Sequence, residues 1–133
     1  AAPSTTVSQK PEVQIPDDPA RPGLAGVVRH PLLWALLLWA LAHMLVNGDL
    51  AHVLLFGLFA VYAAVGMGMI DRRLQAKWGA DVWMTRASAT SNLPFAGNWR
   101  SYRPAVLRLA LAVVVWAGLL HGHLPVIGVS PLP

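Results

Sequence analysis

Residues 29–49, RHPLLWALLLWALAHMLVNGD, open with Arg-His-Pro and close on Asn-Gly-Asp, and the apolar run between these ends has a single polar member, His43. A helix that spans a membrane needs ~20 largely apolar residues at a rise of ~1.5 Å each. This run is short for that purpose but sufficient if its flanking side chains snorkel to the interface. A histidine within such a helix is costly unless it has a partner, so His43 is the first place to look for function.

The composition favours a membrane protein over a soluble one. Hydrophobic residues make up 56% of the chain and charged residues only 12%, about half the usual charged share. The absence of cysteine excludes a disulfide framework, a thiolate metal site and a cysteine nucleophile. The lysine and arginine residues behind the net charge of +4 are distributed unevenly along the chain, as in a membrane protein. This distribution argues against nucleic-acid binding.

We predict an all-α integral membrane protein with three transmembrane helices, at about residues 30–47, 50–70 and 105–120. The first two are separated by a two-residue turn and should form an antiparallel hairpin. Apolar residues at 74, 78 and 82 predict an amphipathic interfacial helix over residues 71–86.

The remaining segments set the domain limits and the orientation. Residues 1–28 are rich in proline and acidic residues, which predicts a disordered or extended arm ahead of a membrane domain at 29–133. Lysine and arginine gather in residues 71–103, so the positive-inside rule predicts that this segment and the N-terminus are cytoplasmic. The C-terminus is then expected on the periplasmic side.

Trp39, His43 and Asn47 are spaced by four residues and share one helix face. A neutral histidine in an apolar bundle is a common ligand of haem iron, so His43 is the candidate metal ligand. The alternative is a buried histidine hydrogen-bonded to a neighbouring helix. Trp39 is the candidate for packing on a flat cofactor, and Asn47 either contacts a ligand at the outer mouth or forms the turn.

His30 either contacts an anion or cofactor near a helix N-terminus or serves as an interfacial cap. At the hairpin turn, Asp49 either contacts a ligand or caps the second helix, and its spacing of three residues allows it to pair with His52. His121 and His123 supply only two local ligands, too few for a metal site, and are expected at a solvated helix end. Because the sequence holds no nucleophile triad, it does not decide whether the protein is an enzyme.

Three blocks carry a resemblance to a known family: RHPLLWALLLWALAHMLVNGDLAHVLLFG, DRRLQAKWGADVWMTRASATSNLPF and the terminal GVSPLP. Over residues 29–133 the chain resembles the NnrU family of bacterial membrane proteins. The family is named for an association with denitrification and nitric-oxide metabolism. It is related to the 15-cis-zeta-carotene isomerase, a membrane protein that uses haem b. The resemblance therefore implies a multi-pass protein of the bacterial inner membrane.

The same resemblance implies that His43 is an axial ligand of haem b. A cysteine three residues earlier in the isomerase is matched here by Ala40. The isomerase's other axial histidine lies in an N-terminal helical half that has no counterpart in these 133 residues. We therefore expect the second ligand to come from another chain.

Three functions follow as hypotheses. The first is a haem-b protein linked to nitric-oxide metabolism, denitrification or carotenoid isomerisation. The second is a non-catalytic accessory subunit of a larger respiratory or photosynthetic membrane complex, which would meet other subunits through its helices and N-terminal arm. The third is a relative of the membrane methyltransferases that use S-adenosylmethionine, which also place Arg-His-Pro at a helix start. Their acidic pair after the hairpin is not visible here, where Asp71 stands alone.

Overall fold

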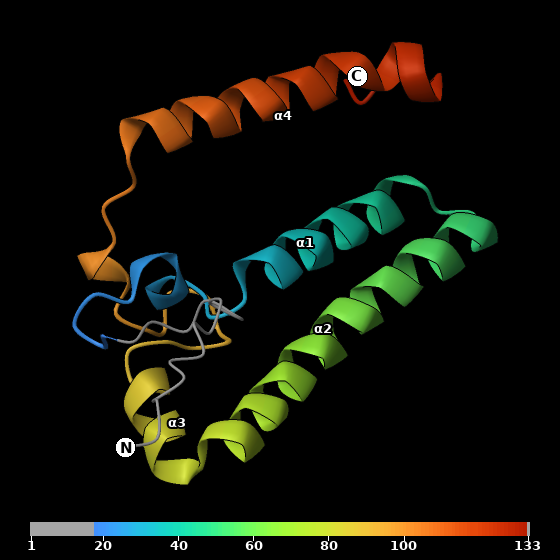
Figure 1. The fold of residues 1–133 in the computed structure, drawn as a ribbon. Helices are drawn as coiled ribbons and strands as arrows, with labels where there is room; N and C mark the ends of the chain where they lie inside the picture. Colours follow the sequence, from blue (N-terminus) through green and yellow to red (C-terminus); the bar gives the residue numbers. More distant parts are fainter. Residues whose placement is uncertain (1–17, 133) are drawn as a thin grey trace, which may run out of the picture. The chain divides into compact units, whose positions relative to one another are not determined.

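The computed structural model describes residues 18–132, and within that range the chain is all-helical, as predicted (Figure 1). These residues divide into two compact units, 18–102 and 103–132, which we describe separately. In chain order the elements are η1 (Gly23–Gly26), α1 (Pro31–Val46), α2 (Leu50–Trp78), α3 (Ala80–Ala87), η2 (Trp99–Ser101) and α4 (Val106–Ile127), where η denotes a 3-10 helix.

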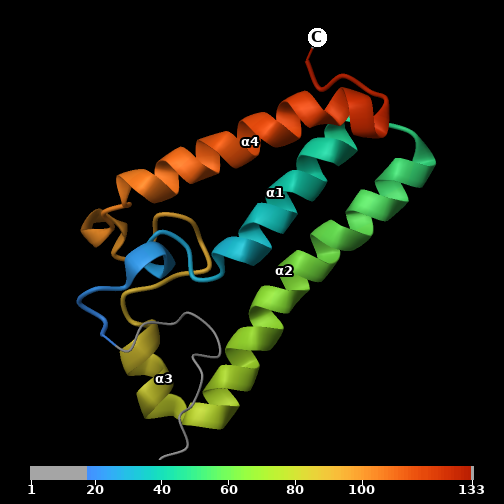
Figure 2. The same cartoon turned by 45° about the horizontal axis from the view of Figure 1, so that its top comes forward.

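Helices α1 and α2 form the predicted antiparallel hairpin (Figures 1 and 2). Pro31 occupies the first turn of α1, where its missing N–H leaves no hydrogen bond unmade. Asp49 caps α2 as expected, because its carboxylate accepts the backbone N–H of His52 at 3.2 Å.

The two helices of the hairpin meet along a thin apolar seam. Its centre is Ala40, which is 0% exposed and packs with Phe56 and Ala60, while Leu37 and Met44 cover the edges. Small residues at such a seam let two helix backbones approach closely. Most of the large apolar side chains on the other faces are exposed, which is typical of helices that face lipid.

Two of the described helices, α2 and α4, are long and apolar enough to cross a membrane. At ~1.5 Å per residue, α2 is about 43 Å long and α4 about 33 Å, against a hydrocarbon core of ~30 Å. Helix α1 has 16 residues and reaches only about 24 Å. Two of the three predicted spans, α2 and α4, therefore meet the length criterion, and α1 is too short to meet it by itself.

The predicted boundary between the second span and an interfacial helix over 71–86 is wrong. Helix α2 continues without a break to Trp78, and Gly79 with φ of 81° separates it from α3. The charged residues after Ile70 favour water over lipid, but they do not end the helix, because the arginine and lysine residues among them are good helix formers. Only the glycine, which adopts a positive φ at little cost, ends the helix.

Helix α4 is also longer than the predicted 105–120. It runs through Pro125 to Ile127 and ends at Gly128, whose φ is 84°. A proline within a helix removes one backbone hydrogen bond, and long apolar helices tolerate that loss. The residues from His121 to Ile127, expected outside the helix, are therefore helical.

Part of the predicted N-terminal arm, residues 1–17, lies outside the described residues. Further along that arm, Gly23–Gly26 forms the short helix η1, in which Ala25 and Gly26 are buried. These residues pack near η2 in the first unit, as Figure 2 also shows.

We predict that Ala40→Leu destabilises the hairpin by about 1–3 kcal/mol, because extra methylene groups in a closed seam force the helices apart. The measurement is the free energy of unfolding in detergent. Ala35→Leu, on an exposed position of the same helix, is the control and should change it by less than about 0.5 kcal/mol. Equal stabilities of the two variants would contradict this packing.

Candidate functional site

Polar side chains from three segments meet at one end of the hairpin. Arg29 and His30 precede α1, Asp71 follows the apolar part of α2, and Thr90 and Asn92 lie in the loop after α3. We call these five residues the Asp71 cluster. The antiparallel hairpin explains the meeting, since it returns the chain near residue 70 to the level at which α1 begins.

The Asp71 carboxylate is the centre of the cluster and accepts three hydrogen bonds. Nη1 of Arg29 and Nδ2 of Asn92 each lie 2.7 Å from Oδ2, and Nε2 of His30 lies 2.7 Å from Oδ1. His30 is only 5% exposed. A carboxylate removed from water in this way needs charged or polar donors, and these three supply them.

The Arg29 guanidinium ties the cluster to the loop after α3. Its Nε donates to Oγ1 of Thr90 at 2.9 Å, and its Nη2 donates to the backbone carbonyl of Thr90 at 3.2 Å. The guanidinium carbon also lies 5.2 Å from the centre of the Trp83 ring on α3. Arginine suits this position because its planar group donates in several directions at once and stacks on an aromatic face.

The backbone of the same loop is fastened to the residues around the start of α1. The N–H of Arg29 donates to the carbonyl of Ser91 at 2.7 Å, and the indole N–H of Trp34 donates to the carbonyl of Asn92 at 2.9 Å. A Cβ at Gly97 would lie 2.7 Å from the carbonyl oxygen of Gly26, so only glycine fits this approach.

We call this arrangement a clamp. Arg29 donates to Asp71 and to Thr90, and Asp71 accepts from Asn92, so the start of α1, α2 and the loop after α3 are held together. His30, for which the sequence left an anion contact or an interfacial cap open, occupies the N-cap position of α1, and its ring faces the Asp71 carboxylate. Asp71 and Asn92 were missed as site residues. An acidic residue directly after an apolar span, opposite Arg29 and His30 across a hairpin, is the signal that predicts such a pairing.

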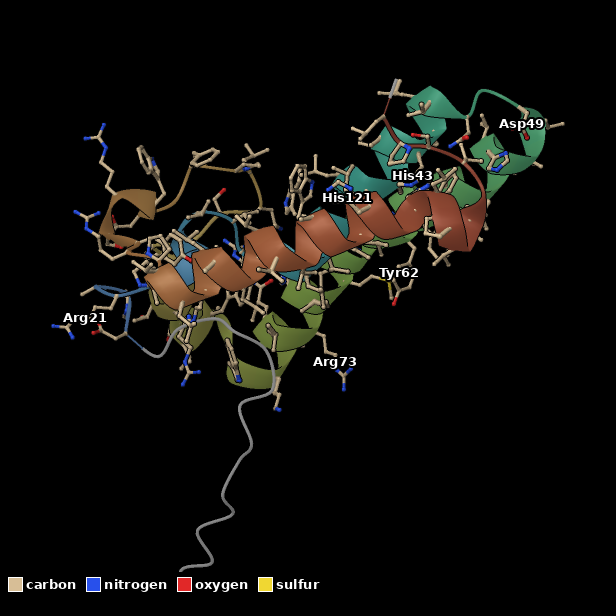
Figure 3. All side chains as sticks on the ribbon, turned by 90° about the horizontal axis from the view of Figure 1, so that it is seen from above. Arg21, His43, Asp49, Tyr62, Arg73 and His121 are labelled. Carbon is tan, nitrogen blue, oxygen red and sulfur yellow. The ribbon has the colours of Figure 1, made fainter. Side chains whose placement is uncertain are left out.

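The site that the sequence predicts around His43 lies near the opposite end of the hairpin, the end with the turn that contains Asp49 (Figure 3). Nδ1 of His43 lies 2.8 Å from the carbonyl oxygen of Trp39. A carbonyl only accepts, so Nδ1 donates, and in the neutral ring the lone pair is then on Nε2. A hydrogen bond of this kind orients a histidine for metal binding.

Aromatic rings surround His43. The ring centre of Trp39 lies 4.7 Å from that of His43, which confirms that the two share a helix face. The ring of Phe56, from α2, lies 4.9 Å away on the other helix of the hairpin. Phe59 continues the group, with its ring 5.9 Å from that of Trp39.

Asn47 is the C-cap residue of α1, and its backbone N–H and its Nδ2 both donate to the carbonyl of His43, each at 3.0 Å. Asp49 and His52 form the predicted side-chain pair at the turn. The backbone N–H of His52, and then its ring, hold the pKa of the Asp49 carboxyl below its usual value. The cap on α2 therefore stays ionised as the pH falls below that usual value.

In the second unit, His121 and His123 lie two residues apart on α4, about 200° around the helix from each other. Nδ1 of His123 lies 2.9 Å from the carbonyl oxygen of Val129. Within residues 18–132, no group of three or more His, Asp or Glu side chains is placed to hold a metal ion.

Comparison with known proteins identifies the family. The model of the NnrU protein family matches residues 2–131, nearly the whole chain. The chain belongs to the NnrU family. The match therefore includes residues 2–28, which precede the segment 29–133 that carries the resemblance in the sequence analysis. No curated protein and no solved structure matches this NnrU chain.

We predict that Asp71→Ala destabilises this NnrU protein by about 2–4 kcal/mol. Arg29 and His30 are largely shielded from water, and the substitution removes the acceptor that they share. The measurement is the free energy of unfolding in detergent. Arg72→Ala, at the adjacent exposed position, should cost no more than about 0.5 kcal/mol. A loss for Asp71→Ala as small as that of the control would show that the cluster contributes little.

Proposed function

We propose that this NnrU protein is a multi-pass membrane protein that binds haem b with His43 as an axial ligand. The hydrogen bond from Nδ1 of His43 to the carbonyl of Trp39 carries the proposal. It directs the lone pair of Nε2 away from the helix backbone, as iron ligation requires.

The surroundings of His43 fit a flat aromatic cofactor. Trp39, Phe56 and Phe59 provide apolar ring surface on two helices, and Trp39 and Phe59 are partly exposed at the edge of the hairpin. A planar macrocycle would cover such rings and remove their surface from water or lipid. The donor set is also suitable, since a neutral imidazole in apolar surroundings is a common axial ligand.

A haem bound here would supply one-electron or small-gas chemistry, such as that needed in nitric-oxide metabolism, or the electronic assistance needed for a polyene isomerisation. The residues of this chain hold and orient the imidazole, and the aromatic group limits access of water to it. We propose that a second axial histidine comes from another chain.

The proposal places the protein in the bacterial inner membrane, with its N-terminus in the cytoplasm and its C-terminus in the periplasm. The lengths of α2 and α4 support membrane crossing. The positive residues after Ile70 support a cytoplasmic position for the end of the hairpin that holds the Asp71 cluster.

A second candidate function is that of an accessory subunit in a larger respiratory or photosynthetic membrane complex. The exposed apolar side chains of the hairpin favour it, because α1 is short and would gain from packing against neighbouring helices. Purification in mild detergent tests this candidate. Partner subunits recovered in fixed stoichiometry would support it, and migration of the chain as a small free protein would count against it.

We predict that His43→Ala removes bound haem b, because the iron loses its protein ligand, while the chain still inserts into the membrane. Haem content is measured by the reduced-minus-oxidised visible spectrum of protein expressed with an ample haem supply. His52→Ala, within the first turn of α2, is the matched control and should keep the wild-type haem content. Wild-type haem content in His43→Ala, or no haem in the wild-type protein, would refute the ligand role.

A further inference from the structure

The loop that the Asp71 cluster fastens to the hairpin presents large apolar side chains to its surroundings. We call residues 93–100 the interfacial loop. Leu93 is 69% exposed, Phe95 is 63% exposed and Trp99 is 41% exposed. Three such side chains within seven residues are unusual on a surface that faces only water.

The exposure of these side chains does not come from a loosely held backbone. Phe95 has a φ of 62°, which is rare for an aromatic residue, and its N–H donates to the carbonyl of Val27 at 2.8 Å. The N–H of Asn98 donates to the carbonyl of Ala89, also at 2.8 Å. The surrounding contacts therefore hold the loop in a strained conformation that points its apolar side chains outward.

The position of the loop along the hairpin is equally fixed. Hydrogen bonds attach the loop and the residues just before it to residues 26–29 and to the Asp71 cluster. These attachment points lie at the start of α1 and at the end of the apolar part of α2. In a chain that crosses the membrane through α2, these points mark the boundary between hydrocarbon and headgroups. The interfacial loop thus lies at the depth of the headgroup layer.

The chemistry of the loop matches that layer. The ring of Phe95 meets the ring of Trp99 edge to face at 5.8 Å, and the guanidinium carbon of Arg100 lies 5.6 Å from the Trp99 ring centre. Tryptophan favours the membrane interface, where its ring is apolar and its N–H reaches polar groups. An arginine next to it offers charge complementarity to lipid phosphate.

We propose that the interfacial loop inserts Leu93, Phe95 and Trp99 among phospholipid headgroups and so anchors the clamped end of the hairpin at the membrane surface. Arg100 contacts lipid phosphate from the same loop. This proposal rests on the membrane placement proposed above, and its test separates the two.

Spin labels on single cysteines measure the depth of each position, and the natural chain contains no cysteine to remove. Leu93→Cys and Phe95→Cys, each in the full chain, are labelled and reconstituted into vesicles of phosphatidylethanolamine and phosphatidylglycerol. Accessibility to oxygen, which concentrates in lipid, is compared with accessibility to a water-soluble nickel complex. Ser88→Cys, at an exposed polar position just after α3, is the control expected to face water, and Leu58→Cys on an exposed face of α2 is the control expected to face lipid.

We expect labels at 93 and 95 to favour oxygen over nickel, at a shallower depth than the label at 58, while the label at 88 favours nickel. Two positions are used because Phe95 has a strained backbone that a substitution can relax. If the labels at 93 and 95 match the label at 88, the loop lies in water and the proposal fails. If they are shielded from both reagents, a protein partner covers the loop and the proposal also fails. If the label at 58 favours nickel, the membrane placement itself is wrong.

Discussion

A carboxylate that is largely removed from water must be matched by donors, and the first unit of this protein is built around one such group. Asp71 on α2 accepts from Arg29 and His30 before α1 and from Asn92 in the loop after α3, so the carboxylate joins three separate segments. Burying a charge of this kind gains little by itself, but each donor lost leaves an uncompensated charge behind. The pairing therefore selects a single arrangement of the start of α1, the end of the apolar part of α2 and the loop after α3. Glycines at 26 and 97 allow the backbones to approach as closely as that arrangement needs.

The hairpin consequently has two chemically different ends joined by a thin seam of small residues. One end is polar, clamped and next to a group of positive charges. The other end holds His43 among aromatic rings, close to the turn between the helices. A clamp at one end fixes the relative position of α1 and α2, and so it also fixes the distance between His43 on α1 and Phe56 on α2. In the haem site that we propose, this coupling would let a charge pair remote from His43 contribute to holding the cofactor.

The sequence was sufficient for the features that depend on local patterns. The hairpin, the extent of α1 to within a residue at each end, the cap at Asp49 and the shared face of Trp39 and His43 all follow from composition and spacing, and the structure bears them out. Helix ends were harder to predict, because the charges after Ile70 suggested a boundary that only Gly79 provides. The Asp71 cluster could not be derived from periodicity, since it joins residues 21 to 61 positions apart. Predicting it requires the antiparallel register of the hairpin and the position of a loop that follows a separate helix.

The most direct test of this account is a double-mutant cycle on Arg29 and Asp71. The free energies of unfolding in detergent of Arg29→Ala, Asp71→Ala and the double variant are compared with that of the wild-type protein. If the two side chains act as one clamp, the double variant loses less stability than the sum of the single variants, with a coupling energy above about 1 kcal/mol. Additive losses, within about 0.3–0.5 kcal/mol, would show that the pair does not hold the fold together and would contradict the account.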